Sequence, residues 1–90
     1  MKSIWLQENS WVDIEEYLKN EKVVLIPIGS IEQHGPAAAL GLDSYVAKAL
    51  VEDVALKTNV ISTPPIWFGD STHHLAFAGT ISIRTEILSE

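Results

Sequence analysis

The stretch from Gly29 to Asp43 contains three residues that could hold a metal ion: Glu32, His34 and Asp43. One residue separates Glu32 from His34, and in an extended segment this spacing points both side chains to the same side of the backbone. Asp43 follows a bend rich in small residues, which could bring its carboxylate back beside them. Carboxylate and imidazole groups together are a ligand set for zinc, manganese or iron. The alternative is that Glu32 and His34 are solvated loop residues and that Asp43 only caps the following helix.

A second polar stretch, "GDSTHHLAFAGT", contains the other two histidines, His73 and His74. Because they are adjacent, we expect their side chains to point in different directions, so that they are not both ligands; both could also be surface residues. Asp70 and Ser71 make a Ser-His-Asp triad conceivable, but the G-x-S-x-G pattern of a nucleophile elbow is missing. Trp67, just before this stretch, could wall a substrate pocket or could simply pack its loop onto the domain.

The elements that must position these residues alternate between strands and helices. The continuous apolar run "VVLIPI" is typical of a strand buried on both faces. The order β-α-β-α-β predicts an α/β fold with a mainly parallel sheet. The predicted elements are a short strand over 3–6, a helix over 11–20, strands over 23–28 and 59–63 with a helix over 44–57 between them, a short strand over 80–83 and a helix that opens at 85.

The positions of the two long loops predict where a site would lie. In a parallel sheet, every loop that follows a strand lies along the carboxyl edge, where open α/β sheets bind ligands. Residues 29–43 and 64–79 form the two long loops that follow strands, and all three histidines of the chain lie in them. We therefore expect a functional site at this edge.

Composition restricts the class of protein. The 90 residues are enough for one domain, and a hydrophobic content of 47% is typical of a globular chain. The net charge of −6 argues against a nucleic-acid partner, and the absence of cysteine excludes thiolate ligands. No apolar run approaches the ~20 residues of a membrane span, and the first residues do not resemble a signal peptide. We therefore expect a cytoplasmic protein without a membrane partner.

Three segments resemble the creatininase (creatinine amidohydrolase) family: "IPIGSIEQHGP" over 26–36, "LGLD" over 40–43 and "GDSTHHLAFAGTISIR" over 69–84. The first is similar to the family's strand followed by G-S-x-E-Q-H-G-P, with an aspartate nine residues after the histidine. The third is similar to its G-x-S-x-x-H-x-x-F-x-G-T-x-S segment. Family members are more than twice this length, so residues 1–90 resemble the N-terminal part of a single creatininase-like α/β domain.

The resemblance implies a three-layer α/β/α fold, usually hexameric, with two divalent metal ions (Zn, Mn or Fe). Glu32 would bind one ion, His34 the other and Asp43 both, with a water between the ions as the nucleophile. The implied activity is hydrolysis of a cyclic amide, a formamide or a similar C–N bond in a small-molecule substrate, by a homo-oligomer. His74, which matches the family's histidine, and Trp67 are expected to contact the substrate.

The chain departs from the family pattern at several positions. Ala37 and Ala39 replace a histidine and a proline, and His73 replaces a glutamate. A further histidine and glutamate that complete the family's metal site, and a proton-shuttling histidine, lie in the part of the family's length that these residues do not include. The alternative is therefore a truncated or degenerate, non-catalytic creatininase-like module that associates with another chain.

Overall fold

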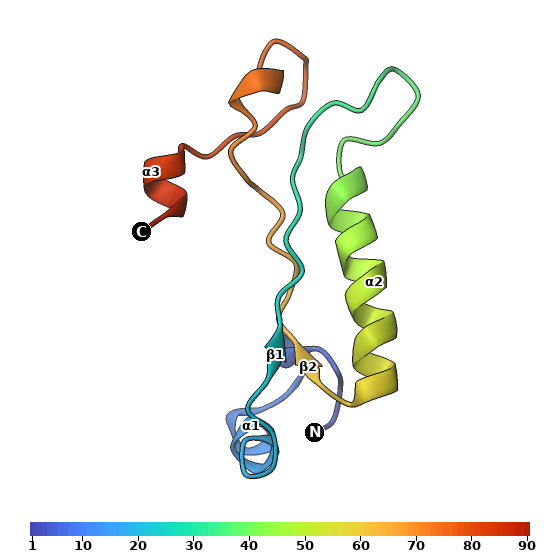
Figure 1. Ribbon diagram of the computed structural model, residues 1–90, viewed down its shortest axis with the longest axis vertical. Coiled ribbons are helices and arrows are strands. Elements are labelled where there is room, and N and C mark those ends of the chain that lie inside the picture. Colours follow the sequence, from blue (N-terminus) through green and yellow to red (C-terminus); the bar gives the residue numbers. More distant parts are fainter.

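A two-stranded parallel sheet and one long helix form the frame of the chain, whose computed structural model describes residues 1–90 (Figure 1). None of the helices is both long enough and apolar enough to cross a membrane. The elements, in order, are a 3-10 turn η1 (Leu6–Glu8), α1 (Trp11–Tyr17), β1 (Val24–Leu25), α2 (Leu42–Thr58), β2 (Ile61–Ser62), a second 3-10 turn η2 (Thr72–His74) and α3 (Thr85–Leu88). The predicted α/β class with parallel pairing is confirmed.

Both strands are shorter than the sequence predicts. Val24 lies opposite Ile61 in the parallel register, and regular pairing ends one residue later. Pro27 interrupts it because proline has no N–H to donate, although its carbonyl still accepts a hydrogen bond from the Ile66 N–H at 2.9 Å. An isolated bridge between Ile28 and Ile66 continues the contact. The segments predicted as strands over 3–6 and 80–83 likewise form only isolated bridges.

The helices follow their capping signals. Helix α1 begins with a capping box, in which the Asp13 N–H donates to Ser10 Oγ at 3.2 Å and the Ser10 N–H donates to Asp13 Oδ2 at 2.9 Å. It ends at Tyr17, three residues earlier than the predicted residue 20. Helix α2 is longer than predicted and ends before Asn59, whose positive φ of 58° is a conformation that asparagine tolerates at a helix end.

The side chain of Tyr17 ties α1 to both strands. Its hydroxyl donates a hydrogen bond to the Val23 carbonyl at 2.7 Å and accepts one from the Ile61 N–H at 3.2 Å. This one group therefore fixes the lower end of the sheet, where α1 lies beside the start of β1 (Figure 1).

The expectation that "VVLIPI" is buried on both faces is wrong for this chain. Val24, Ile26 and Ile28 leave 45%, 52% and 67% of their surface exposed. Helix α2 packs against β2, but the chain has no second long helix to cover the strands from the other side. The buried apolar core is correspondingly small and consists of Ala55 and Ile61.

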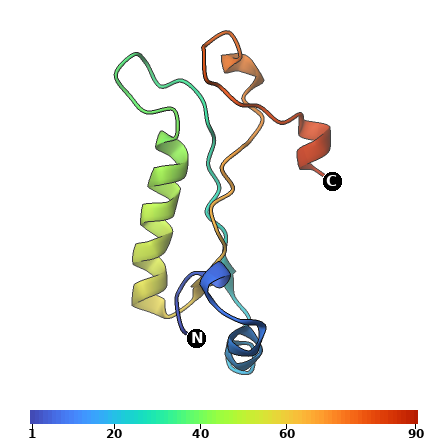
Figure 2. The same cartoon turned by 180° about the vertical axis from the view of Figure 1, so that it is seen from behind.

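The two long loops run together, as expected for a parallel sheet. After β1 and β2 the chain continues in two extended segments that lie side by side and lead to the same end of the molecule (Figures 1 and 2). Helix α2 starts at that end. The arrangement brings the polar residues of both loops to the carboxyl edge of the sheet.

Candidate metal centre

The first loop turns back on itself so that its beginning meets the start of α2. Glu32 donates its backbone N–H to the Leu40 carbonyl at 3.1 Å. Between them lies Gly35, whose φ of +85° favours glycine. This closure brings Asp43, the second residue of α2, next to Glu32.

Ser44 is buried at the start of α2, and its side chain contacts both loops. Its hydroxyl lies 3.3 Å from the Ser30 carbonyl oxygen and 3.4 Å from that of Trp67. The backbone of Gly29 passes so close below Ser44 that a Cβ on Gly29 would lie 2.6 Å from the Ser44 nitrogen. Glycine at position 29 is therefore what permits helix and loop to approach.

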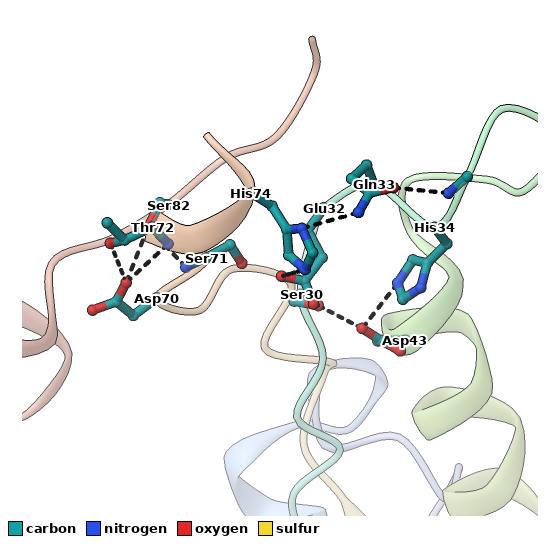
Figure 3. Close-up of polar contacts among 11 residues, drawn as sticks. Ser30, Glu32, Gln33, His34, Asp43, Asp70, Ser71, Thr72, His74 and Ser82 are labelled. Atoms are coloured by element: carbon teal, nitrogen blue, oxygen red, sulfur yellow. Dashed lines mark hydrogen bonds and ion pairs between the residues drawn. The ribbon is translucent and has the colours of Figure 1, made fainter. Parts of the chain in front are cut away.

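Glu32, His34 and Asp43 converge as the sequence predicts (Figure 3). Their ligand atoms all lie within 4.8 Å of one another. His34 Nε2 is 3.1 Å from Asp43 Oδ2, and the Ser30 hydroxyl oxygen lies 2.7 Å from the same carboxylate oxygen and 3.1 Å from Glu32 Oε1. Two carboxylates and an imidazole thus share one small volume.

Sequence reasoning did not include Ser30 in this site. The signal was nevertheless available, because residues 30, 32 and 34 alternate along an extended segment and therefore share one side of it. In the structure, the Ser30 hydroxyl lies between the carboxylates of Glu32 and Asp43.

The surroundings of Asp43 favour its ionised form. The hydrogen bond from Ser30 is the main cause that lowers the pKa of Asp43 below its ordinary value, and burial opposes it; nearby His34 adds to the lowering. An ionised carboxylate is the form that binds a cation.

The second loop brings both of its histidines to Glu32. Ligand atoms of Glu32, His73 and His74 also lie within 4.8 Å of one another. The two imidazole centroids are only 4.0 Å apart, so the expected divergence of these side chains is wrong. Both residues lie in the 3-10 turn η2, where neighbouring side chains are separated by about a third of a turn instead of pointing to opposite faces.

The two ring nitrogens of His74 face two residues of the first loop. Nδ1 lies 3.0 Å from Gln33 Nε2, and Nε2 lies 3.8 Å from Glu32 Oε2. Trp67 meets Tyr45 of α2 edge-on at a centroid distance of 5.4 Å, so its ring packs the second loop against α2. Contact of His74 and Trp67 with a substrate stays a prediction.

Asp70 closes the second loop. None of its hydrogen bonds is to a histidine. Asp70 accepts hydrogen bonds from the hydroxyls of Thr72 and Ser82 and from the Thr72 N–H (Figure 3). The hydroxyl of Thr85 donates to it as well. The bonds from Thr72 and then Thr85 hold the pKa of Asp70 well below its usual range. These hydrogen bonds of Asp70 join the two sides of the loop that carries His74, and we call Asp70 with Thr72, Ser82 and Thr85 the clasp.

A small cavity of about 290 Å³ lies between the two loops. Its wall is formed by both loops and includes Gln33, which contacts His74, together with apolar groups. The lining residues are Gln33, Gly35, Pro36, Leu40, Phe77 and Ala78.

Comparisons with known proteins agree with this geometry. The sequence model of the family described as creatinine amidohydrolase matches residues 7–90. The chain is 37% identical over 84 residues to 3-dehydro-scyllo-inosose hydrolase of Thermotoga maritima. The matched segment covers 92% of this chain and 27% of that protein. It is 43% identical over 74 residues to the mycofactocin precursor peptide peptidase of Mycobacterium ulcerans, covering 72% of this chain and 30% of that protein.

Solved structures show the same relationship. A creatininase variant of the Zn-Zn type superimposes with a TM-score of 0.88 at 25% sequence identity, over 99% of this chain and 37% of that one. The chain spans less than a third of the length of the two curated relatives. By its sequence match and by its α/β fold, the chain belongs to the creatinine amidohydrolase (creatininase) family.

Proposed function

We propose that this chain supplies the first half of the metal centre of a hydrolase that cleaves an amide or similar C–N bond in a small molecule. The observation that carries the proposal is the convergence of Glu32, His34 and Asp43 within 4.8 Å of one another. Membership of the creatinine amidohydrolase family supports the reaction class. Both curated relatives are named as a hydrolase or a peptidase.

The donor set fits a divalent zinc, manganese or iron ion. Ligand atoms lie ~2.0–2.2 Å from zinc, so two ligands of one ion are at most about 4.4 Å apart. The 3.1 Å between His34 Nε2 and Asp43 Oδ2 satisfies this limit. The ligand atoms of Glu32, His34 and Asp43 all lie within 4.8 Å of one another, which is close to it. A bound ion of this kind polarises a carbonyl group and makes water a stronger nucleophile.

We infer that Asp43 serves two ions. Oδ2 of its carboxylate contacts both His34 Nε2 and the hydroxyl of Ser30, which also lies 3.1 Å from Glu32 Oε1. We infer that Glu32 binds one ion, His34 a second and Asp43 both, while the Ser30 hydroxyl orients Asp43.

The centre is incomplete for catalysis within these residues. Sharing three ligands between two ions gives each ion two protein ligands, whereas a catalytic zinc has about three plus water. The exposed apolar side chains of Val24, Ile26 and Ile28 also offer a surface for further protein. We infer that additional chain or another subunit, as in a homo-oligomer, completes both the site and the cover of the sheet.

The small cavity is the proposed place for the substrate. Its volume of about 290 Å³ fits a small amide, and apolar side chains line it around the polar Gln33. We propose that Trp67 and His74 border the substrate side of the same edge.

The test is metal retention by the purified chain after dialysis, measured by elemental analysis with zinc or manganese. We expect the wild type to retain metal and Asp43→Ala to lose it. Asp53→Ala is the matched control, because Asp53 is an exposed aspartate of the same helix that pairs with Lys57. If Asp43→Ala and Asp53→Ala retained equal metal, the ligand assignment would be wrong and the non-catalytic alternative would stand.

A further inference from the structure

His74 joins the two loops through a polar chain whose direction can be assigned. The Gly35 N–H donates to Gln33 Oε1 at 2.9 Å, which fixes which end of the Gln33 amide is the oxygen. The amide nitrogen of Gln33 then faces His74 Nδ1 at 3.0 Å. Gly35 thus orients a residue that reaches across to the second loop.

The orientation of Gln33 fixes the proton of His74. An amide nitrogen can only donate, so His74 Nδ1 must accept. A neutral imidazole that accepts at one nitrogen carries its proton on the other. The Nε2–H of His74 is therefore the group that faces Glu32, where Nε2 lies 3.8 Å from Oε2.

We propose that His74 is a positioning residue for Glu32, and this proposal rests on the proposed role of Glu32 as a metal ligand. The two oxygens of Glu32 face different groups: the oxygen of the Ser30 hydroxyl, whose single hydrogen is directed to Asp43, lies 3.1 Å from Oε1, and the Nε2–H of His74 faces Oε2. The separation of 3.8 Å is longer than a hydrogen bond, so in this structure the Nε2–H faces Oε2 without bonding to it. The Phe77 ring lies edge-on to the imidazole, with the two centroids 6.3 Å apart.

The proton arrangement argues against the other role open to His74. Glu32, His73 and His74 also lie close enough to hold an ion together. A metal needs a lone pair on the nitrogen it binds, but Gln33 occupies the lone pair of Nδ1 and thereby leaves the proton on Nε2. His74 is thus a donor to the carboxylate, like the outer hydrogen-bond partners that orient metal ligands.

The direct test is the tautomer of His74 in the metal-free, ¹⁵N-labelled chain, read from long-range ¹H–¹⁵N correlation spectra at a pH where the ring is neutral. We expect the Nε2–H form in the wild type. Gln33→Glu replaces the donor by a carboxylate, which only accepts, so in that variant we expect a proton on Nδ1. A wild-type ring protonated on Nδ1, or a tautomer that is unchanged in Gln33→Glu, would overturn the assignment.

The second arm measures zinc affinity by competition with a chromophoric chelator. His74→Leu removes the donor, and loss of such a partner lowers metal affinity about 10–100-fold. His74→Gln keeps an N–H donor and should stay within a few-fold of the wild type. His73→Leu tests the exposed neighbour, which belongs to the cluster of Glu32, His73 and His74 but has no hydrogen bond to Gln33; we expect a smaller loss than in His74→Leu.

The outcomes separate this proposal from the proposed function. Equal large losses in His74→Gln and His74→Leu, joined by an equally large loss in His73→Leu, would make the two histidines ligands and overturn the positioning role. An unchanged affinity in His74→Leu would overturn it as well. If the wild type bound no zinc, the proposed function would fail, while the tautomer spectra would still decide the Gln33–His74 assignment.

Discussion

Gly29→Ala should separate the first loop from α2. A Cβ at position 29 would overlap Ser44 Oγ and Cα and would lie 2.6 Å from the Ser44 nitrogen. Ordinary contacts between such atoms begin near 3.5 Å, so about 1 Å of separation must be created. Because two of the three obstructing atoms belong to the backbone, rotation of a side chain cannot relieve the overlap.

The expected consequences are a loss of stability and a loss of metal affinity. Overpacking of this kind costs about 1–3 kcal/mol in the free energy of unfolding. Any shift of Ser44 also moves Asp43 away from Ser30, which is now 2.7 Å from it. Urea unfolding followed by circular dichroism measures the first effect, and zinc competition measures the second.

Gly69→Ala is the matched control. A Cβ there would meet only the Gly29 carbonyl oxygen, at an ordinary distance of 3.6 Å. Replacing glycine where alanine fits stabilises by about 0.4–1 kcal/mol through the unfolded chain. The reasoning would be refuted if Gly29→Ala were as stable as Gly69→Ala, or if adding Ser44→Gly, which leaves the obstructing backbone in place, restored stability to Gly29→Ala.

Three further changes test other parts of the structure. Asp43→Ala should lower zinc affinity more than Glu32→Ala, because a bridging carboxylate serves both ions; equal losses in a zinc titration would remove the bridging assignment. The lowered pKa of Asp70 means that its contribution to stability is present above the ordinary carboxyl pKa and is lost as the pH falls toward the lowered value; Asp70→Asn should therefore weaken the acid dependence of urea unfolding, and an unchanged dependence would exclude the clasp. Tyr17→Phe removes a hydroxyl that bonds Val23 and Ile61, and should cost about 1–3 kcal/mol in the same unfolding assay; a cost near zero would show that water replaces it.

The residues with strong local signals could be predicted from the sequence. The capping box of Ser10 and Asp13 depends only on spacing, and the convergence of Glu32 and His34 follows from backbone alternation in one segment. Asp43 is a candidate because the bend before it is rich in small residues, but its return to the site depends on how the loop closes; the family resemblance adds only its bridging role.

Other features depend on contacts between segments that are distant in sequence. The orientation of His73 and His74 follows from a short 3-10 turn that the sequence pattern does not indicate. The exposure of Val24 and Ile28 follows from how few elements surround the strands. An apolar run indicates that a strand can be buried, but whether it is buried depends on which other elements are present to cover it.

We propose that Glu32, His34 and Asp43 bind metal. The position of a zinc ion in crystals of the zinc-loaded chain tests this ligand set. Anomalous scattering at the zinc edge identifies the ion without reference to the protein atoms. We expect a peak ~2.0–2.2 Å from His34 Nε2 and from an oxygen of Asp43, with Glu32 as a further ligand of the centre. A peak held by His73 and His74 with no contact to His34 or Asp43, or no peak at this edge of the sheet, would contradict it.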